Sequence, residues 1–134
     1  MPDVIERGAV AVLLLRVADE VPAIERGWSD LEANVGLRGR TFYGVFDGAA
    51  NEYRVCVVVK DGDDADALGL ERGTIPGGRY LRERLRGVPP ALYERIGPTV
   101  KALEATGGAD VDESRPVVEH YRRHDEIDVL VPVR

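Results

Sequence analysis

The residues with the clearest chemical potential are a carboxylate and a phenol two positions apart. Glu119 and Tyr121 lie in the segment 116–122, whose β-branched and aromatic residues predict a strand. Because successive side chains of a strand point to opposite faces, both project to one face together with Val117. A carboxylate desolvated among aromatic rings attracts an organic cation, and each ring adds about 0.5 to 2 kcal/mol of cation–π attraction. The pair predicts a binding site for a planar lipophilic cation.

Further aromatic rings are needed to complete such a site. The candidates are Tyr43, Tyr80, Tyr93 and Trp28. Trp28 also fits the apolar stripe of a predicted helix, which favours a place in the core. A purely structural alternative places Glu119 at a sheet edge, paired with an arginine such as Arg79 or Arg122. The sequence alone leaves both interpretations open.

Other catalytic and metal-binding patterns are weak. The serines, Ser29 and Ser114, do not lie in a Gly-x-Ser-x-Gly elbow, which disfavours a serine hydrolase. His120 and His124 have a spacing that would share a metal on a helix. On the predicted strand, however, the same spacing separates them by roughly 13 Å. We therefore expect surface histidines and no metal site.

The acidic and glycine-rich segments do not match known ligand loops. Residues 61–66 carry four aspartates, but the sixth position of the segment is Asp66 where an EF-hand needs Gly, and the twelfth is Arg72 where it needs Glu. The Gly77-Gly78 pair precedes a strand-like stretch rather than a helix, so it does not form a phosphate-binding loop. The sequence predicts no cofactor.

Length and composition predict one globular domain over residues 1–134. Apolar types make up 44% and charged types 31%, and the formal net charge of -6 disfavours contact with nucleic acid or anionic lipid. The lone Cys56 excludes an intramolecular disulfide. The apolar stretch 9–15 is too short to span a bilayer and lacks the features of a signal peptide. We expect a cytoplasmic protein that does not bind membranes.

Hydrophobic periodicity divides the chain into two halves with the same order of elements. In the first half, a buried strand is predicted at 8–17, then a helix that Pro22 opens and Gly36 ends, then a hairpin of 41–46 and 52–60. In the second half, two extended pieces within 70–86 bend at a Pro-Gly-Gly turn. A helix from Pro89 to about 107 follows, broken near Gly97-Pro98, and a hairpin of 116–122 and 126–133 closes the chain.

The recurring strand–helix–strand–strand order predicts an internal duplication. Repeats at about 8–60 and 70–134 would bury their apolar faces against each other around a pseudo-twofold axis. The expected fold is α+β, with duplicated βαββ units, antiparallel sheets, two main helices and a central ligand groove. A ferredoxin-like domain with incidental matching of the order is the alternative.

Several short motifs in the second half resemble those of one family. Residues 75–80 read Ile-Pro-Gly-Gly-Arg-Tyr, residues 115–121 contain Glu119-His120-Tyr121, and residues 127–133 form an apolar ending with Pro132. In this order they resemble the gyrase-inhibitor-like (GyrI-like) effector-binding domain. The first half is similar mainly in its order of elements and in the strand around Tyr43.

The resemblance implies a ligand groove at the pseudo-twofold interface, as in stand-alone proteins and in the sensor half of multidrug-responsive transcription regulators. It assigns the ligand-facing carboxylate to Glu119, with aromatic residues around it. Two departures stand out. The chain has no helix-turn-helix segment, and Val100-Lys101 stand where many relatives place a Trp.

The resemblance also implies two other activities. Some members of the family resemble hydrolases of strained electrophilic molecules; here Glu119, its pKa raised in an apolar groove, would activate water and Tyr121 would donate to the oxyanion. Another branch inhibits DNA gyrase through protein contact. Binding of an amphipathic small molecule is the first expectation, hydrolysis the second, and inhibition of a protein partner the third. A homodimer is also compatible with the sequence.

Overall fold

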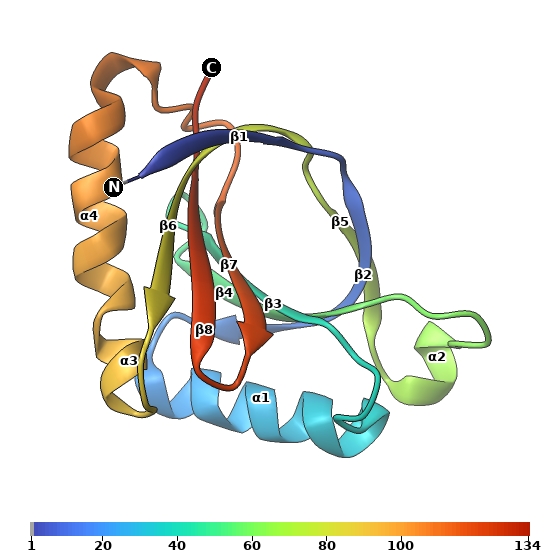
Figure 1. The fold of residues 1–134 in the computed structure, drawn as a ribbon. Coiled ribbons are helices and arrows are strands. Elements are labelled where there is room, and N and C mark those ends of the chain that lie inside the picture. The colour runs from blue at the N-terminus through green and yellow to red at the C-terminus, as the bar shows by residue number, and fades with distance from the viewer. Residues whose placement is uncertain (1) are drawn as a thin grey trace.

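The computed structural model describes residues 2–134 and shows a curled sheet with helices on its outer face (Figure 1). Its elements are β1 (Asp3–Arg7), β2 (Val10–Ala18), α1 (Val21–Val35), β3 (Phe42–Asp47), β4 (Glu52–Val58), α2 (Ala65–Leu68), β5 (Glu71–Ile75), β6 (Gly78–Arg86), α3 (Ala91–Glu94), α4 (Ile96–Gly107), a 3-10 turn (Gly108–Asp110), β7 (Val117–Arg123) and β8 (Glu126–Pro132). None of the helices in the described part of the chain is long and apolar enough to cross a membrane.

The order of the strands reveals the internal symmetry. All neighbours are antiparallel in the order β1-β6-β8-β7-β3-β4-β2-β5. The unit β2-α1-β3-β4 and the unit β6-α4-β7-β8 take equivalent places on either side of the β3–β7 contact. This confirms the predicted α+β fold with duplicated βαββ units, which here share one continuous sheet. The repeat boundaries 8–60 and 70–134 stay a prediction.

The two outermost strands curl the sheet. Residues 3–7 pair with 78–82, and residues 10–14 pair with 71–75 in the same register, so one long pairing is bent at two corners. A Cβ on Gly77 would lie 2.7 Å from the backbone nitrogen of Ala9, so only glycine allows this close crossing. The sequence did not reveal β1, because its pairing partner lies more than 70 residues away.

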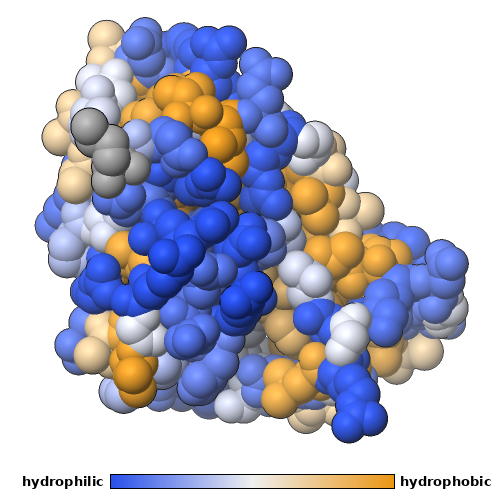
Figure 2. Space-filling view, viewed as in Figure 1, coloured by the Kyte–Doolittle hydropathy of each residue, from blue (hydrophilic) through white to orange (hydrophobic). Residues whose placement is uncertain are grey.

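Each face of the curled sheet has its own core. On the outer face, α1 packs on β2 and β4 around the fully buried Leu31, and α4 packs on β6 and β8 around Leu103. On the inner, concave face the apolar cluster consists of Val12, Leu14, Tyr43, Val45, Cys56, Ile75, Tyr80, Val118 and Leu130. Figure 2 shows hydrophilic residues gathered in the middle of the side seen there. Burial on both faces makes β8 buried throughout.

The helices begin and end close to the predicted residues, with two differences. α1 and both predicted hairpins are confirmed. The second predicted helix breaks at Arg95, slightly before Gly97-Pro98, and Pro98 lies in the first turn of α4, where a missing N–H costs little. The acidic segment 61–66, predicted to be a solvated loop, instead leads into the short helix α2, which begins at Ala65. Its N-cap is Asp64, whose side chain accepts hydrogen bonds from the backbone nitrogens of Asp66 and Ala67.

Candidate functional site

Glu119 is the centre of a buried cluster of hydroxyl groups on the outer face of β7. Its Oε1 accepts hydrogen bonds from the hydroxyls of Tyr53 and Tyr121, each at 2.6 Å, and the two hydroxyl oxygens are 3.3 Å apart. Gly44 of β3 lies directly opposite Glu119. A Cβ at position 44 would collide with the Tyr53 hydroxyl and lie 2.8 Å from Oε1 of Glu119. Glycine therefore makes the space in which the three side chains meet.

The carboxylate has no cationic partner within residues 2–134. Arg79 pairs with Glu6, and Arg122 pairs with Glu126. The structural alternative, in which one of these arginines neutralises Glu119, is therefore wrong. Both arginines pair with acidic groups closer to their own positions in the sheet.

Burial controls the protonation of this cluster. It raises the pKa of Glu119 above its ordinary value, and the two phenol hydrogen bonds oppose the rise. Burial, together with the negative charge of Glu119, raises the pKa of Tyr53 and Tyr121 far above 10, so both phenols remain hydrogen-bond donors. Oε2 of Glu119 accepts no hydrogen bond from a described residue, and the residue keeps 7% of its surface exposed. One acceptor oxygen is thus left for a ligand.

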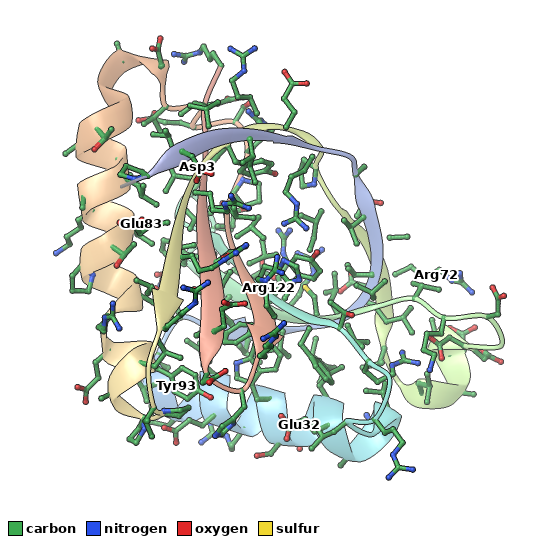
Figure 3. The ribbon with its side chains drawn as sticks, in the orientation of Figure 1. Asp3, Glu32, Arg72, Glu83, Tyr93 and Arg122 are labelled. Atoms are coloured by element: carbon green, nitrogen blue, oxygen red, sulfur yellow. The ribbon has the colours of Figure 1, made fainter. Side chains whose placement is uncertain are left out.

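A row of aromatic rings connects this carboxylate to the helices. Trp28 of α1 contacts Tyr121 edge-on, with ring centroids 5.1 Å apart, and Phe42 at 6.1 Å. Tyr93 of α3 contacts Tyr121 from the other side at 6.4 Å. Figure 3 places Tyr93 beside α3, near the start of α1. Tyr93 is 46% exposed, and Trp28 and Tyr121 are half-buried, so the row forms an aromatic surface at the seam between the halves.

Two of the predicted site residues lie on the wrong face. Tyr43 pairs with His120, so it projects to the concave face, opposite to Gly44 and Glu119. Tyr80 also lies in the concave cluster, where its hydroxyl donates to the carbonyl of Pro76. The prediction that these two rings surround Glu119 is wrong. The reason is that residue alternation fixes faces within one strand, whereas the relation between strands depends on their register.

The remaining predicted residues do meet. Trp28, Tyr93, Glu119 and Tyr121 form one contiguous set. Trp28 belongs both to this set and to the core under α1, so the two interpretations of it are compatible. Tyr53 was not predicted as a site residue, because it reaches Glu119 only across β3. The available signal was Gly44, since a glycine inside an aromatic strand often marks a close approach of neighbouring groups.

The main surface hollow lies away from Glu119, and the described residues offer no metal site. An open hollow of about 540 Å³ lies between β2, α2 and β5, and its lining includes Leu14, Leu70 and Arg72. Within residues 2–134 no cluster of three His, Cys, Asp or Glu side chains is arranged to hold a metal. At Glu119 the aromatic rings contact one another, so a ligand reaching the carboxylate has to part them. The predicted groove at the seam stays a prediction.

Comparisons with known proteins support the fold. No protein-family model and no curated protein matches the sequence. An integron cassette protein from Vibrio cholerae has a similar structure (TM-score 0.72, 13% identity, 99% of this chain and 95% of that one). So do SAV2435 bound to tetraphenylphosphonium (0.66, 14%, 100% and 94%) and a hydrolase from Listeria innocua (0.58, 10%, 99% and 91%). At identities this low, the structural similarity shows a shared fold and nothing further.

Proposed function

We propose that the protein binds lipophilic organic cations at Glu119, beneath the rings of Trp28, Tyr121 and Tyr93. The observation that carries this proposal is a buried carboxylate that has no cationic partner among residues 2–134 and lies below a partly exposed aromatic surface. The fold neighbour bound to tetraphenylphosphonium supports it, because that ligand combines a positive charge with four aromatic rings. The protein would then act as a receptor for small molecules, as expected for a GyrI-like effector-binding domain.

The energetics of the site favour a cation over a neutral ligand. A carboxylate held away from water loses hydration, and only two phenol hydrogen bonds replace it. A bound cation supplies the missing counter-charge in a region of low polarity, where Coulomb attraction is stronger than in water. The rings add cation–π attraction of about 0.5 to 2 kcal/mol each. A neutral ligand of the same shape gains only the apolar contact.

Access requires movement of the rings. Tyr93 is the most exposed ring and lies on α3, a helix of four residues. Short helices have little stability of their own. We therefore expect α3 and Tyr93 to shift first when a ligand approaches Tyr121 and Glu119.

The test is a titration with tetraphenylphosphonium, followed by calorimetry, on the wild type and on Glu119→Gln. The amide keeps the shape and loses the charge, so binding should weaken about 10- to 100-fold. Glu126→Gln is a matched control, because Glu126 is also 7% exposed but pairs with Arg86 and Arg122. Triphenylphosphine oxide, a neutral ligand, should bind equally to the wild type and to Glu119→Gln. Equal loss in both Gln variants, or no binding to the wild type, would refute the proposal.

A hydrolase of strained electrophiles is the second candidate. Burial raises the pKa of Glu119 towards that of a general base, and the hydroxyls of Tyr53 and Tyr121 could donate to a developing oxyanion. One fold neighbour is a hydrolase. Repeated turnover of an epoxide that stops in Glu119→Gln would favour this activity, whereas stoichiometric binding without product would exclude it.

Inhibition of DNA gyrase stays a prediction from the resemblance alone. A supercoiling assay that is unaffected by excess protein would exclude it. Absence of nucleic-acid binding and the possible homodimer likewise stay predictions.

A further inference from the structure

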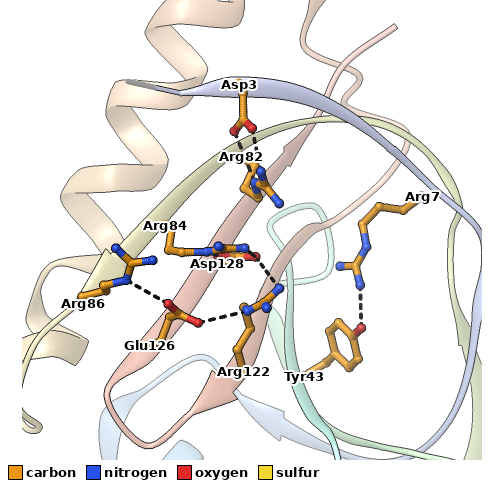
Figure 4. A network of polar contacts seen from close by, with 9 residues as sticks. All are labelled: Asp3, Arg7, Tyr43, Arg82, Arg84, Arg86, Arg122, Glu126 and Asp128. Carbon is orange, nitrogen blue, oxygen red and sulfur yellow. Dashed lines mark hydrogen bonds and ion pairs between the residues drawn. The ribbon is translucent and has the colours of Figure 1, made fainter.

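One part of the concave face carries a network of arginines and carboxylates beside Arg7. Figure 4 shows the network, in which Arg82 pairs with Asp3, Arg84 with Asp128, Arg86 with Glu126, and Arg122 with both Glu126 and Asp128. Arg7 lies beside it. Five arginines and three carboxylates leave two positive charges in this group, although the whole chain has a formal charge of -6. Such a local excess attracts anions.

Arg7 is the member of this network that has no acidic partner in the described chain. Its Nη2 donates a hydrogen bond of 2.7 Å to the Tyr43 hydroxyl, and its guanidinium lies 5.4 Å from the centre of the Tyr43 ring. These two contacts hold the guanidinium in place. Its other N–H groups donate to no described residue. A planar fork with free donors is well suited to a carboxylate or a phosphate.

His120 adds a neutral ring to the same place. It stacks on Tyr43, with ring centroids 4.4 Å apart, and lies opposite Asp128 of the neighbouring strand β8. Burial and the charge of Arg7 lower the pKa of His120 to about 4. Arg122 and Arg84 lower it further, and only Asp128 raises it. The imidazole is therefore neutral at pH 7 and lies in a positive field.

We propose that the concave face binds a small oxyanion, a phosphate or a carboxylate, at Arg7 beside the Tyr43–His120 stack. Arg7 supplies a fixed guanidinium fork with unused donors, and together with the four arginines and three carboxylates around it Arg7 makes up the excess of two positive charges. A phosphate group, with a charge of about -1.5 to -2 at neutral pH, would balance that excess. The site is separate from Glu119, because residues 119 and 120 project to opposite faces of β7.

NMR of the histidine rings is a direct test. Adding inorganic phosphate should shift the His120 ring signals and raise the pKa of His120 by about 1, because a nearby anion favours the imidazolium. His124, in the turn between β7 and β8, is the internal control and should not respond. Acetate in place of phosphate tests whether the site takes a carboxylate. A response of His120 to both anions shows a general oxyanion site, and a response to one of them shows whether the site is specific for phosphates or for carboxylates. If His120 does not respond to either anion at millimolar concentration, the proposal is wrong.

Variants then test the role of Arg7. Arg7→Gln should weaken phosphate binding at least about tenfold, and Arg7→Lys, which keeps the charge but loses the fork, should weaken it less. Arg79→Gln is a matched control, because Arg79 lies on the paired strand β6 and pairs with the exposed Glu6. Thermal melting checks that each variant is folded, and tetraphenylphosphonium binding should be unchanged in Arg7→Gln. Equal weakening in Arg7→Gln and Arg79→Gln would reduce the effect to overall charge and overturn the proposal.

Discussion

Gly44 determines whether the Glu119 cluster can exist, so we predict that Gly44→Ala is strongly destabilising. The added methyl group would overlap the Tyr53 hydroxyl and lie 2.8 Å from both the ring carbon Cζ of Tyr53 and Oε1 of Glu119. The backbone cannot easily yield, because β3 is held between β4 and β7. Tyr53 or Glu119 therefore has to move, and the hydrogen bond between them weakens.

The size of the effect follows from these two consequences. Overpacking a buried site costs about 1 to 3 kcal/mol, and a lost hydrogen bond to a charged group costs about 1.5 to 3 kcal/mol. Because one movement can relieve the overlap at the expense of one hydrogen bond, we expect a total of about 3 kcal/mol. Tyr53→Phe removes the hydroxyl that collides, so Gly44→Ala should cost at least about 1 kcal/mol less in the Tyr53→Phe background.

Urea unfolding of the wild type, both single variants and the double variant measures this coupling. The expected result is a double variant that is more stable than the sum of the two single effects predicts. Strict additivity would mean that the methyl group and the hydroxyl do not compete for one space, and it would refute the packing described for this cluster.

Further predictions concern both faces of the sheet. Because the pKa of His120 is lowered from 6.5 to about 4, the unfolded chain binds more protons between these pH values. Urea unfolding should therefore show a loss of stability of roughly 2 kcal/mol as the pH falls from 6.5 to 4, after allowance for partial solvent exposure, and His120→Gln should lack it. In calorimetric titrations Trp28→Ala should weaken tetraphenylphosphonium binding several-fold, whereas Tyr43→Phe should not, because Trp28 contacts Tyr121 and Tyr43 lies on the opposite face. Tyr121→Phe should lower stability by about 1.5 to 3 kcal/mol and strengthen cation binding, since the phenol competes for Glu119; weaker binding would contradict this competition. Leu31→Ala should cost about 2 to 5 kcal/mol in urea unfolding, because Leu31 is fully buried; a cost below 1 kcal/mol would contradict its place in the core.

Local patterns in the sequence predicted much of the fold. The apolar stripe of α1, the turn residues of both hairpins and the repeated order of elements are short-range signals, and each corresponds to an observed element. β1 and α2 escaped prediction for different reasons. β1 is short, carries mixed polarity and depends on pairing with β6, whereas α2 has only four residues and depends on its cap at Asp64.

The candidate site shows the same division between local and non-local information. The common face of Glu119 and Tyr121 follows from their spacing, and the observed hydrogen bond between them agrees with it. The contributions of Tyr53 and Trp28 depend on strand register and helix placement, which spacing does not encode. Tyr43 and Tyr80 were assigned to the wrong face for that reason. The sequence thus identified candidate aromatic residues but did not predict on which face of the sheet each one lies.

The two seam strands explain why one small domain can present two different sites. β3 and β7 are the strands through which the halves contact each other in the centre of the sheet, so a ligand on either of their faces touches both halves. On the outer face Glu119 is a negative charge without a cation, and on the concave face Arg7 is a positive charge without an anion, in each case among the described residues. Neither Glu119 nor Arg7 has a partner of opposite charge among the described residues, whereas the arginines around Arg7 are paired with carboxylates. Glu119 is buried and Arg7 is half-buried, and unpaired charges at such positions cost stability, so the two charges agree with the two ligands of opposite charge proposed above.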